Sequence, residues 1–594
     1  MSSLFEGLNI ATRGLSASQL GINVTGQNIT NAGTEGYSRK RIEQNADWRR
    51  DGSYGQMGFG VEVYSINRVR DQFIDRLVND ESTRYGYYSV KDASYARIED
   101  IFNESGASRS ALNSLLNDFW NGWDDVSKNP ESAGARETLR SSTESLVTQF
   151  HYLTTQLRAY KDTMNDEIEA RVHKINELTA GIYRCNMVIA ASENTIGNKA
   201  NDTRDQRDKM LQDLAMLTDV DYYEDEHGVI TVSSNGQLLV SPAKNHELII
   251  SRQEFTERDG HQYAKVEVRL DLTGTEFRPK QGELRALMDV RDVDIPKYEN
   301  YLNDLAQSLI TEVNKIHQTG YALSGLSFID FFDSDPNNFS AANIKLGQAI
   351  KDDINNIAAG VGGKVINIDH MRVIAPSTPP SPTDPIPALT ISYTSAPPQA
   401  VSLHMQDLQP PTSADGSSYP QFRHINKGTL TIEIEGRTLQ EGLDYYVDYQ
   451  NAEIIFNDDN GEIAAAAMNG TLHLTFDYNA TGYAGPGDGD NALLLSQLRN
   501  SLVMQGDVFG KSTQTINQFY SGMLGQLGTE RNAAGAGLNT RAFALQQLMV
   551  RQNEVMGVNL DEEIASLIQY QHTYQASARY LTTINTMLET LLNM

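Results

Sequence analysis

The distribution of proline divides this chain into parts that can be helical and parts that cannot. Of its 17 prolines, none lies before Pro130 and none after Pro486, whereas 11 lie between Pro376 and Pro420. Proline in a helix interior removes a backbone hydrogen bond and clashes with the preceding turn. The two ends of the chain can therefore form long helices, and the segment 376–387 is predicted to be an extended linker.

Both ends carry apolar residues at seven-residue spacing, which is typical of helices that pack along a narrow seam. At the N-terminal end the main set is Met1, Leu8, Leu15, Ile22 and Ile29, and a weaker second set is Leu4, Ala11, Ser18 and Thr25. At the C-terminal end one set is Leu560, Leu567, Tyr574, Leu581 and Leu588, and the other is Glu563, Tyr570, Ser577, Ile584 and Leu591. In this second set only Glu563 and Ser577 break the apolar pattern.

The first helix is expected to end at Gly33–Gly36, because glycine favours helix termination. The C-terminal helix is expected to start at Asn559 or Asp561 and to run about 34 residues, or about 50 Å. A helix this long needs partners for its seam. One interpretation is an ordinary terminal coiled coil. The other is that the two chain ends pair with each other and then pack against further subunits.

The middle of the chain is predicted to contain long helices and a β insert. Apolar residues at spacings of three and four indicate helices over 146–189 and 295–316, and Asn235–Gly236 between two β-prone runs predicts a tight hairpin. A strand is expected over 263–272. Alternating residues such as those of 429–435 predict a small all-β domain within the helical host.

The expected fold is therefore multidomain and mainly α with β. It combines terminal coiled-coil helices, an intermediate domain of long helices with a small β part, and an inserted all-β outer domain. The expected division is 1–70 (N-terminal helix and extended segment of an inner core domain), 71–364 (helical intermediate domain), 365–486 (β insert), 487–540 (return of the intermediate domain) and 541–594 (C-terminal core helix).

Charge and cysteine content exclude several classes of function. The 49 Lys and Arg against 77 Asp and Glu give a net charge of −28, which disfavours binding to nucleic acid or to anionic membranes. Cys185 is the single cysteine, so neither an intrachain disulfide nor a paired-thiol zinc site can form. The first residues lack the basic and apolar segments of a cleavable secretory signal, and none is expected.

No residue pattern predicts catalysis, a cofactor or a metal site, and the chain is not expected to be an enzyme. Asp202, Asp205 and Asp208 share one helical face, but Arg204 and Arg207 lie between them, which favours a solvated helix start with local ion pairs. The segment 488–491 lacks the glutamate of a calcium loop, so Asp490 or Asn491 is expected to cap a helix. The run 510–512 lacks the earlier glycine of a phosphate loop.

Motifs at both ends and in the middle resemble the bacterial flagellar axial proteins. The stretch Gln27–Arg39 resembles the helix-exit motif of rod, hook and hook-associated proteins, and the stretch Asn559–Arg579 resembles their C-terminal signature. The central motifs, which narrow the resemblance to the hook-associated proteins of the hook–filament junction, are Arg70–Phe73, Ile98–Phe102, Asn129–Pro130, Asp205–Asp208, Val313–Gly320 and Gly487–Ala492.

This resemblance implies a structural role in joining hook to filament. It implies paired terminal helices in a tubular inner core, with outer domains projecting from it. The implied partners are further copies of the chain, the hook protein, the filament-side hook-associated protein 3 and an export chaperone at the C-terminal helix. The implied location is the flagellum, external or periplasmic, reached through the flagellar export apparatus.

The assembly interface is expected at the apolar seam residues of the two terminal helices, namely Leu4, Leu8, Leu15, Ile22, Ile29, Leu560, Leu567, Tyr570, Tyr574, Leu581, Ile584, Leu588 and Leu591. The alternative within the class is a hook or distal rod protein, which the long helical stretch over 136–220 disfavours. The alternative from another class is a secreted wall hydrolase, for which the sequence shows no paired carboxylates or metal ligands.

Overall fold

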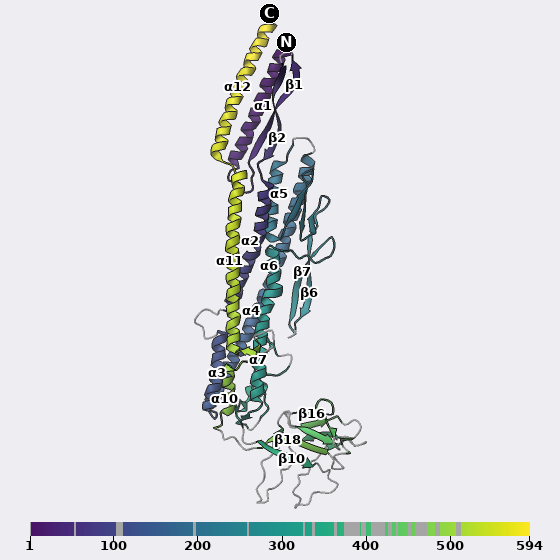
Figure 1. Cartoon of the computed structure of the whole chain (residues 1–594), viewed down its shortest axis with the longest axis vertical. Helices are drawn as coiled ribbons and strands as arrows, with labels where there is room; N and C mark the ends of the chain where they lie inside the picture. Colours follow the sequence, from purple (N-terminus) through teal and green to yellow (C-terminus); the bar gives the residue numbers. More distant parts are fainter. Residues whose placement is uncertain are drawn as a thin grey trace, which may run out of the picture.

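The computed structural model is an elongated rod with both chain ends at one pole (Figure 1). The described residues are 2–361 and 487–593, except for 53–54, 103–110, 194–197, 258–259, 325–326, 336–338 and 506–511. Between 362 and 486 they are 365–372, 392–393, 400–404, 422–425, 430–434, 437–448, 453–457, 462–463, 465 and 472–480.

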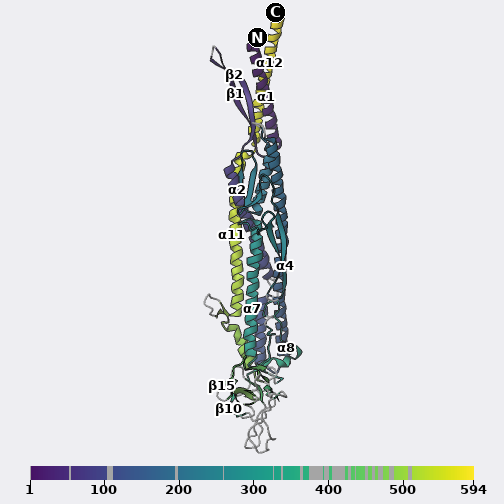
Figure 2. The ribbon, with the colours of Figure 1, turned by 90° about the vertical axis from the view of Figure 1, so that its right-hand side faces the viewer.

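The pole that holds the chain ends is formed by two helices and a long β-hairpin, here called the terminal unit. It consists of α1 (Ser2–Thr30), β1 (Lys40–Gly52), β2 (Gly55–Arg68) and α12 (Leu560–Leu592). β1 and β2 pair antiparallel, and the hairpin lies against α1. The two helices run side by side in both views (Figure 2). The chain ends therefore pair with each other, as the second interpretation of the sequence expected, while packing against further subunits stays a prediction.

Long helices that run parallel to the rod axis build the body. They are α2 (Gln72–Phe102), α3 (Leu112–Lys128), α4 (Ala133–Ser192), α5 (Asn201–Leu217), α7 (Ile295–His317) and α11 (Ile516–Met556). α7 is preceded without a gap by the short α6 (Glu283–Asp289) and a π-helical turn (Val290–Asp294). The short helices are α8 (Gln348–Asp352) and α10 (Asp490–Gln497), with 3₁₀ turns at Ile354–Asn356 and Leu498–Asn500. The 60-residue α4 would span about 90 Å at 1.5 Å per residue.

Local signals explain where the long helices begin. Ser132 caps α4 by accepting a hydrogen bond from the backbone of Ala135, and Thr515 forms a capping box with Gln518 at the start of α11. α11 continues without a break past residue 541, where the sequence predicted a boundary, and ends at Met556. The core helix therefore begins only at Leu560, after a short extended link that starts at Gly557.

Small sheets lie beside the body helices. They are formed by β3 (Asp221–Glu224), β4 (Ile230–Ser234) and β5 (Gln237–Val240), by β6 (Leu248–Thr256) and β7 (Gln262–Leu270), by β8 (Tyr321–Ala322) and β9 (Ala358–Gly360), and by β19 (Met504–Gln505) and β20 (Ser512–Gln514). Asn235 and Gly236 have φ values of 47° and 77°, which confirms the predicted tight turn. β6, the partner of the predicted strand, was not anticipated.

Large side chains from several body helices meet in one continuous core. Its largest fully buried members include Trp120, Trp123, Phe119, Phe150 and Phe331. The ring of Phe331 packs 4.9 Å from that of Trp123, and the rings of Phe119 and Trp120 are 4.8 Å apart. This core lets the body bury its apolar surface within a single chain.

The described residues between 362 and 486 include strands in two small sheets. One contains β10 (Val365–Arg372), β13 (Phe422–Ile425), β14 (Thr431–Ile434), β15 (Arg437–Thr438) and β18 (Leu472–Ala480). The other contains β11 (Ser392–Tyr393), β12 (Ala400–His404), β16 (Tyr445–Asp448) and β17 (Glu453–Phe456). Together with the helical body, these sheets confirm a fold that is mainly α with some β.

Candidate functional site

The seam between α1 and α12 is formed by small residues on α1 and larger ones on α12. A Cβ added to Gly7 would lie 2.9 Å from Ile584, one added to Gly14 2.9 Å from the Ser577 hydroxyl, and one added to Gly21 2.7 Å from the Tyr570 ring. Ala11, Ser18, Thr25 and Asn28 are buried on the same helix. The prediction that the larger apolar residues form the main seam of α1 was wrong, because small residues allow the backbones a closer approach.

The predicted seam residues occupy three kinds of position. Ile584 is buried against α1, whereas Leu560 and Leu591 are exposed and the side chain of Leu4 lies outside the described residues. The half-buried residues at the edges of the seam are Leu8, Leu15, Ile22, Ile29, Leu567, Tyr570, Tyr574, Leu581 and Leu588. The pair thus covers only part of its apolar surface.

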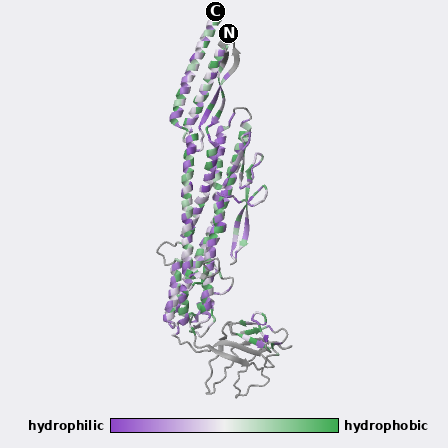
Figure 3. Ribbon diagram, viewed as in Figure 1, coloured by the Kyte–Doolittle hydropathy of each residue, from purple (hydrophilic) through white to green (hydrophobic). Residues whose placement is uncertain are grey.

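The outer side of α12 carries an exposed apolar strip in which Ile564 and Ile568, which the seven-residue pattern did not reveal, follow the predicted Leu560. Leu560, Ile564 and Ile568 follow one another at four-residue spacing and are 48%, 47% and 48% exposed. Met587 is also exposed nearer the C-terminus. Hydrophobic residues are interspersed with hydrophilic ones along the whole of α12 (Figure 3). A spacing of four places these side chains along one side of the helix, where a neighbouring molecule can cover them.

Asn28 and Glu563 join the two terminal helices at their base. Asn28 Nδ2 donates to Glu563 Oε2 and to the Lys40 carbonyl, both at 2.9 Å, while Asn28 Oδ1 accepts from Lys40 N at 3.0 Å. Arg39 Nε donates to Glu563 Oε1 at 2.6 Å, and Arg39 N donates to the Met556 carbonyl at 2.9 Å. Glu563, which interrupts the apolar pattern, is therefore the buried carboxylate that holds this junction.

An ionic cluster of Arg68, Arg70, Asp75, Asp205 and Asp208 joins the terminal unit to the body. Ser38 donates to Asp205 from its backbone at 3.0 Å and from its hydroxyl at 2.6 Å. Arg68 Nη1 lies 2.8 Å from both Asp205 and Asp208. The prediction of a solvated helix start was wrong for Asp205, which is buried, because its partners come from β2 and the loop after α1.

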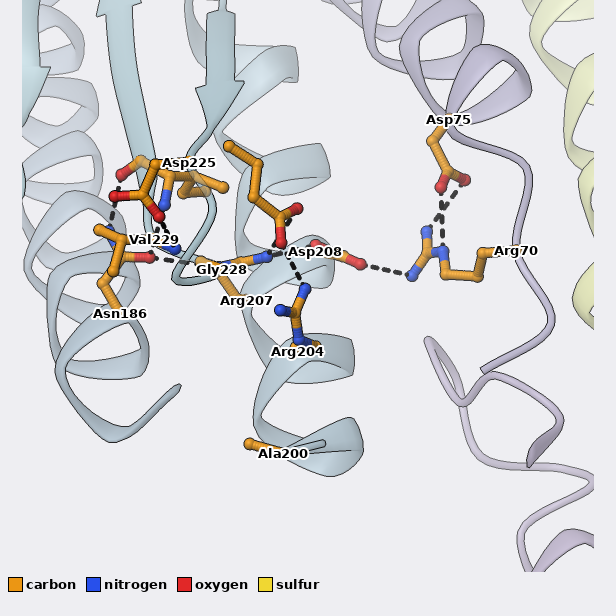
Figure 4. Close-up of polar contacts among 12 residues, drawn as sticks. Arg70, Asp75, Asn186, Ala200, Arg204, Arg207, Asp208, Asp225, Gly228 and Val229 are labelled. Carbon is orange, nitrogen blue, oxygen red and sulfur yellow. Dashed lines mark hydrogen bonds and ion pairs between the residues drawn. The ribbon is translucent and has the colours of Figure 1, made fainter. Parts of the chain in front are cut away.

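Arg70 extends this cluster to α2 and α11. Its guanidinium bonds both oxygens of Asp75, at 2.9 and 3.0 Å, and lies 3.0 Å from Asp208 (Figure 4). Gln552 of α11 donates to Asp75 at 2.6 Å. Such two-point contacts fix orientation as well as distance. The cluster therefore connects β2, α2, α5 and α11 at one level of the rod.

Burial and charge also set the protonation of this region. Burial, together with the carboxylates of Asp202, Asp205 and Glu563, raises the pKa of Tyr37 to about 12, so its hydroxyl stays protonated and donates to Asn28 at 2.9 Å. Burial lowers the pKa of Arg70, but the nearby carboxylates outweigh it and raise that pKa above its ordinary value. The Arg70 guanidinium therefore stays charged within this cluster.

The remaining segments and residues that the sequence raised as possible sites are 488–491, Cys185 and 510–512. The predicted cap at Asp490 or Asn491 was wrong, because α10 begins at Asp490 after an N-cap at Gly489 that makes no side-chain hydrogen bond. Asp488 Oδ1 accepts from the Asp490 backbone amide at 3.0 Å, and Asn491 is buried and donates to the Ala358 carbonyl. Cys185 is buried. The run 510–512 lies mostly outside the described residues.

Within the described residues, no group of three or more His, Cys, Asp or Glu side chains is placed to hold a metal ion. No helix in the described part of the chain combines the length and the apolar character needed to cross a membrane.

Comparisons with known proteins agree with this architecture. The family model of the flagellar hook-associated protein FlgK helical domain matches residues 95–332 of this chain. The family model of the flagellar basal body rod FlgEFG protein C-terminal domain matches residues 540–594. Flagellar hook-associated protein 1 of Bacillus subtilis (strain 168) is 23% identical over 100% of this chain and 99% of its own length. The same protein of Salmonella typhimurium (strain LT2) is 26% identical over 100% of both chains.

A solved structure shows the same fold. The flagellar hook junction protein FlgK from Burkholderia pseudomallei aligns with a TM-score of 0.52 and 16% identity, over 81% of this chain and 100% of that one. The matched family models and the full-length relatives are those of structural components of the bacterial flagellum. Within that class, the chain is similar over its full length to flagellar hook-associated protein 1, and residues 95–332 match the FlgK helical domain.

Proposed function

We propose that the chain is a junction subunit of the flagellum that joins hook to filament by subunit–subunit packing. The observation that carries this function is the full-length similarity to hook-associated protein 1. The apolar strip of Leu560, Ile564 and Ile568 supports packing as the means, because it leaves surface that a single chain does not bury. We place the subunit–subunit contacts on α12 and on the half-buried edges of its seam with α1.

The proposed partners follow from this arrangement. They are further copies of the chain, the hook protein on one side and the filament-side hook-associated protein 3 on the other. An export chaperone is proposed to cover α12 before assembly, since its exposed apolar side chains favour association in solution. No nucleic acid or membrane partner is proposed, in keeping with the net charge of −28. Delivery through the flagellar export apparatus is part of the same proposal.

The division into domains is also a proposal. The terminal unit forms the inner core, the body forms the intermediate domain, and 365–486 forms an outer β domain. The end of α11 at Met556 moves the last boundary to residues 557–559.

The test replaces an exposed apolar residue of α12 in a strain whose own copy of this gene is deleted. Ile568→Asp should leave the purified monomer within about 0.5 kcal/mol of the wild type, because the side chain is half exposed. In the assembled junction the same charge would be buried without a partner, at a cost of several kcal/mol. Electron microscopy should then show hooks without filaments.

Gln569→Asp is the matched control, because Gln569 is the exposed polar neighbour on a different side of the helix. It should restore filaments to near wild-type numbers. Filaments in the complete absence of the protein would contradict the junction function itself. Equal loss with both variants would contradict only the placement of the contact on this strip. A lytic band on peptidoglycan zymography would favour the hydrolase alternative.

A further inference from the structure

A groove of about 870 Å³ lies where the loop after α1 meets the body. Residues 31 and 34–37 of that loop form one wall, and the end of α4 and the start of α5 form the others. The apolar part of its lining includes Val188, which is 49% exposed, and the half-buried Met210. The chain by itself therefore leaves apolar surface uncovered in this groove.

Arg184 of α4 is the charged residue of the lining that has no ion-pair partner among the described residues. It is exposed, and a Cβ built on Gly181 would lie 3.8 Å from its Nη2, which places the guanidinium beside the groove. The other charged residues of the lining are paired within the chain, namely Glu35 with Lys209, Asp202 with Lys40, and Asp205 with Arg68. Arg184 is therefore the charge that a partner can bind without breaking an existing pair.

The start of α12 carries the complementary groups. Asp561 is exposed and makes no ion pair among the described residues, whereas the next two carboxylates of the helix are bound to Arg39. At about 100° per residue, Asp561 lies about 60° from Ile564 and about 20° from Ile568 around the helix. The outer strip of α12 therefore combines apolar side chains with one unpaired carboxylate, and the groove combines an apolar lining with one unpaired guanidinium.

The groove and the strip lie at the same level of the rod but on different sides of it. Arg39 N donates to the Met556 carbonyl at 2.9 Å, which holds the base of α12 next to the loop that forms one wall of the groove. At this level α12 lies on one side of the rod and the end of α4 on the other (Figure 1). Copies that stand side by side with parallel axes would therefore bring the strip of one copy opposite the groove of the next.

We propose that the groove receives the start of α12 from a second copy of the chain. Ile564 and Ile568 of one copy cover Val188 and Met210 of the next. Asp561 pairs with Arg184 across the same contact. The inference rests on the proposed function, whose subunit–subunit packing it specifies. Because the two surfaces differ, the contact is head-to-tail and continues from copy to copy as a ring or helix.

The test cross-links neighbouring copies in isolated flagella. The variant carries Val188→Cys in the groove and Ile564→Cys on the strip, in a Cys185→Ala background, and is expressed in the deletion strain. A flexible bismaleimide should join each groove to the strip of the next copy. Denaturing gels should then show a ladder of dimers, trimers and larger multimers, because a head-to-tail contact repeats.

The controls separate this contact from accidental proximity. Each cysteine alone should give no ladder, because each sits on only one of the two surfaces. Val188→Cys combined with Gln569→Cys should give none either, since Gln569 is exposed but lies about 140° around the helix from Ile564. An equal ladder from the Gln569→Cys pair would overturn the proposal. A product made of the chain and a different protein would also overturn it, because another occupant then fills the groove.

Charge reversal tests the ion pair independently of the cysteines. Arg184→Asp and Asp561→Arg should each lower the number of filaments per cell about fivefold or more, because each places like charges opposite one another. The double variant should restore filaments. Asp561→Arg also removes an acidic residue from the first turn of α12, but a change at Arg184 cannot repair that loss. Restoration therefore reports the pairing itself.

Lys174→Asp is the matched control, because Lys174 is an exposed cation of α4 outside the groove. Combined with Asp561→Arg, it should restore nothing. A double variant of Arg184 and Asp561 that stays as defective as its single parents would overturn the ion pair, and this comparison stands even if the cysteine variant does not assemble. Missing multimers in flagella that need the protein contradict only the docking. Filaments without the protein contradict the junction function.

Discussion

The body and the terminal unit use opposite kinds of side chain where their helices meet. In the body, Phe119, Trp123 and Phe331 interlock in a continuous core that excludes water. In the terminal unit, Gly14 and Gly21 of α1 face Ser577 and Tyr570 of α12. Fully burying one large apolar side chain contributes about 1.5–3 kcal/mol. The difference teaches that the body buries large apolar side chains within one chain, whereas the terminal helices pair through small residues and leave apolar side chains of α12 exposed.

The largest effect should come from the body core. Phe150 is fully buried on α4, and Phe150→Ala should lower the free energy of unfolding by about 3–5 kcal/mol, through lost burial and the cavity left behind. Urea unfolding followed by circular dichroism measures the change. Tyr152→Ala is the control on the same helix, because Tyr152 is 46% exposed, and it should cost far less. Similar costs for both would show that the body core is not packed as described.

A smaller effect in the body depends on pH. His317 is fully buried; Nδ1–H donates to the Ile329 carbonyl and Nε2 accepts from the Ala358 amide, so the neutral ring is satisfied at both nitrogens. Burial, with the charge of Arg136, lowers its pKa to about 4. Below about pH 6.5 the unfolded histidine takes up a proton that the folded one does not. This residue's contribution is therefore complete above about pH 6.5 and is lost between about pH 6.5 and 4.

The loss should reach about 3 kcal/mol at pH 4, since each pKa unit corresponds to about 1.4 kcal/mol. Urea unfolding at several pH values should show it in the wild type, and His317→Gln should flatten the curve over this interval. His572→Gln, at an exposed position on α12, should leave the curve unchanged. An unaltered slope in His317→Gln would contradict the assignment.

The smallest effect tests the seam of the terminal unit. An added Cβ at Gly21 would lie 2.7 Å from the Tyr570 ring, so overpacking by Gly21→Ala should cost about 1–3 kcal/mol. After the ~1 kcal/mol gained in helix propensity, a net destabilisation of up to about 2 kcal/mol is expected. Gly26, on the same helix, has no atom within 4 Å of such a Cβ, and Gly26→Ala should be neutral or stabilising by up to about 1 kcal/mol. Hydrogen exchange of α12 amides should rise in the first variant only. The same response in both would mean that the helices do not approach closely there.

Periodicity was enough to predict the helices but not the side of α1 that packs. The repeat of Leu8, Leu15 and Ile22 correctly indicates a helix at the N-terminal end. This repeat identifies the wrong main seam, because hydrophobic patterns give most weight to large residues. The glycines form the seam because, without a side chain, they let the partner helix approach closely. The glycines also recur every seven residues, at Gly7, Gly14 and Gly21, and this signal could have been found in the sequence.

The ionic cluster was beyond local reasoning for a different physical reason. Asp205 and Arg207 follow each other closely in sequence and suggest local pairing. In the structure Asp205 binds Ser38 and Arg68, which precede it by 167 and 137 positions. A local sequence pattern does not indicate which distant residue will pair with a given carboxylate in the folded chain. Glu563 shows that a charge interrupting an apolar repeat can mark such a buried contact.

The pairing of the two chain ends has a consequence for the order in which the molecule can form. Gly21 and Tyr570 touch across 570 − 21 = 549 positions of sequence. A ribosome adding about 5–20 residues per second needs roughly half a minute to two minutes to cover that distance. Throughout that time α1 has no α12 to pair with, while helices of the body are already being completed. The terminal unit is therefore the last part of the chain to close, and any newborn chain passes through a long-lived state in which the first helix is open.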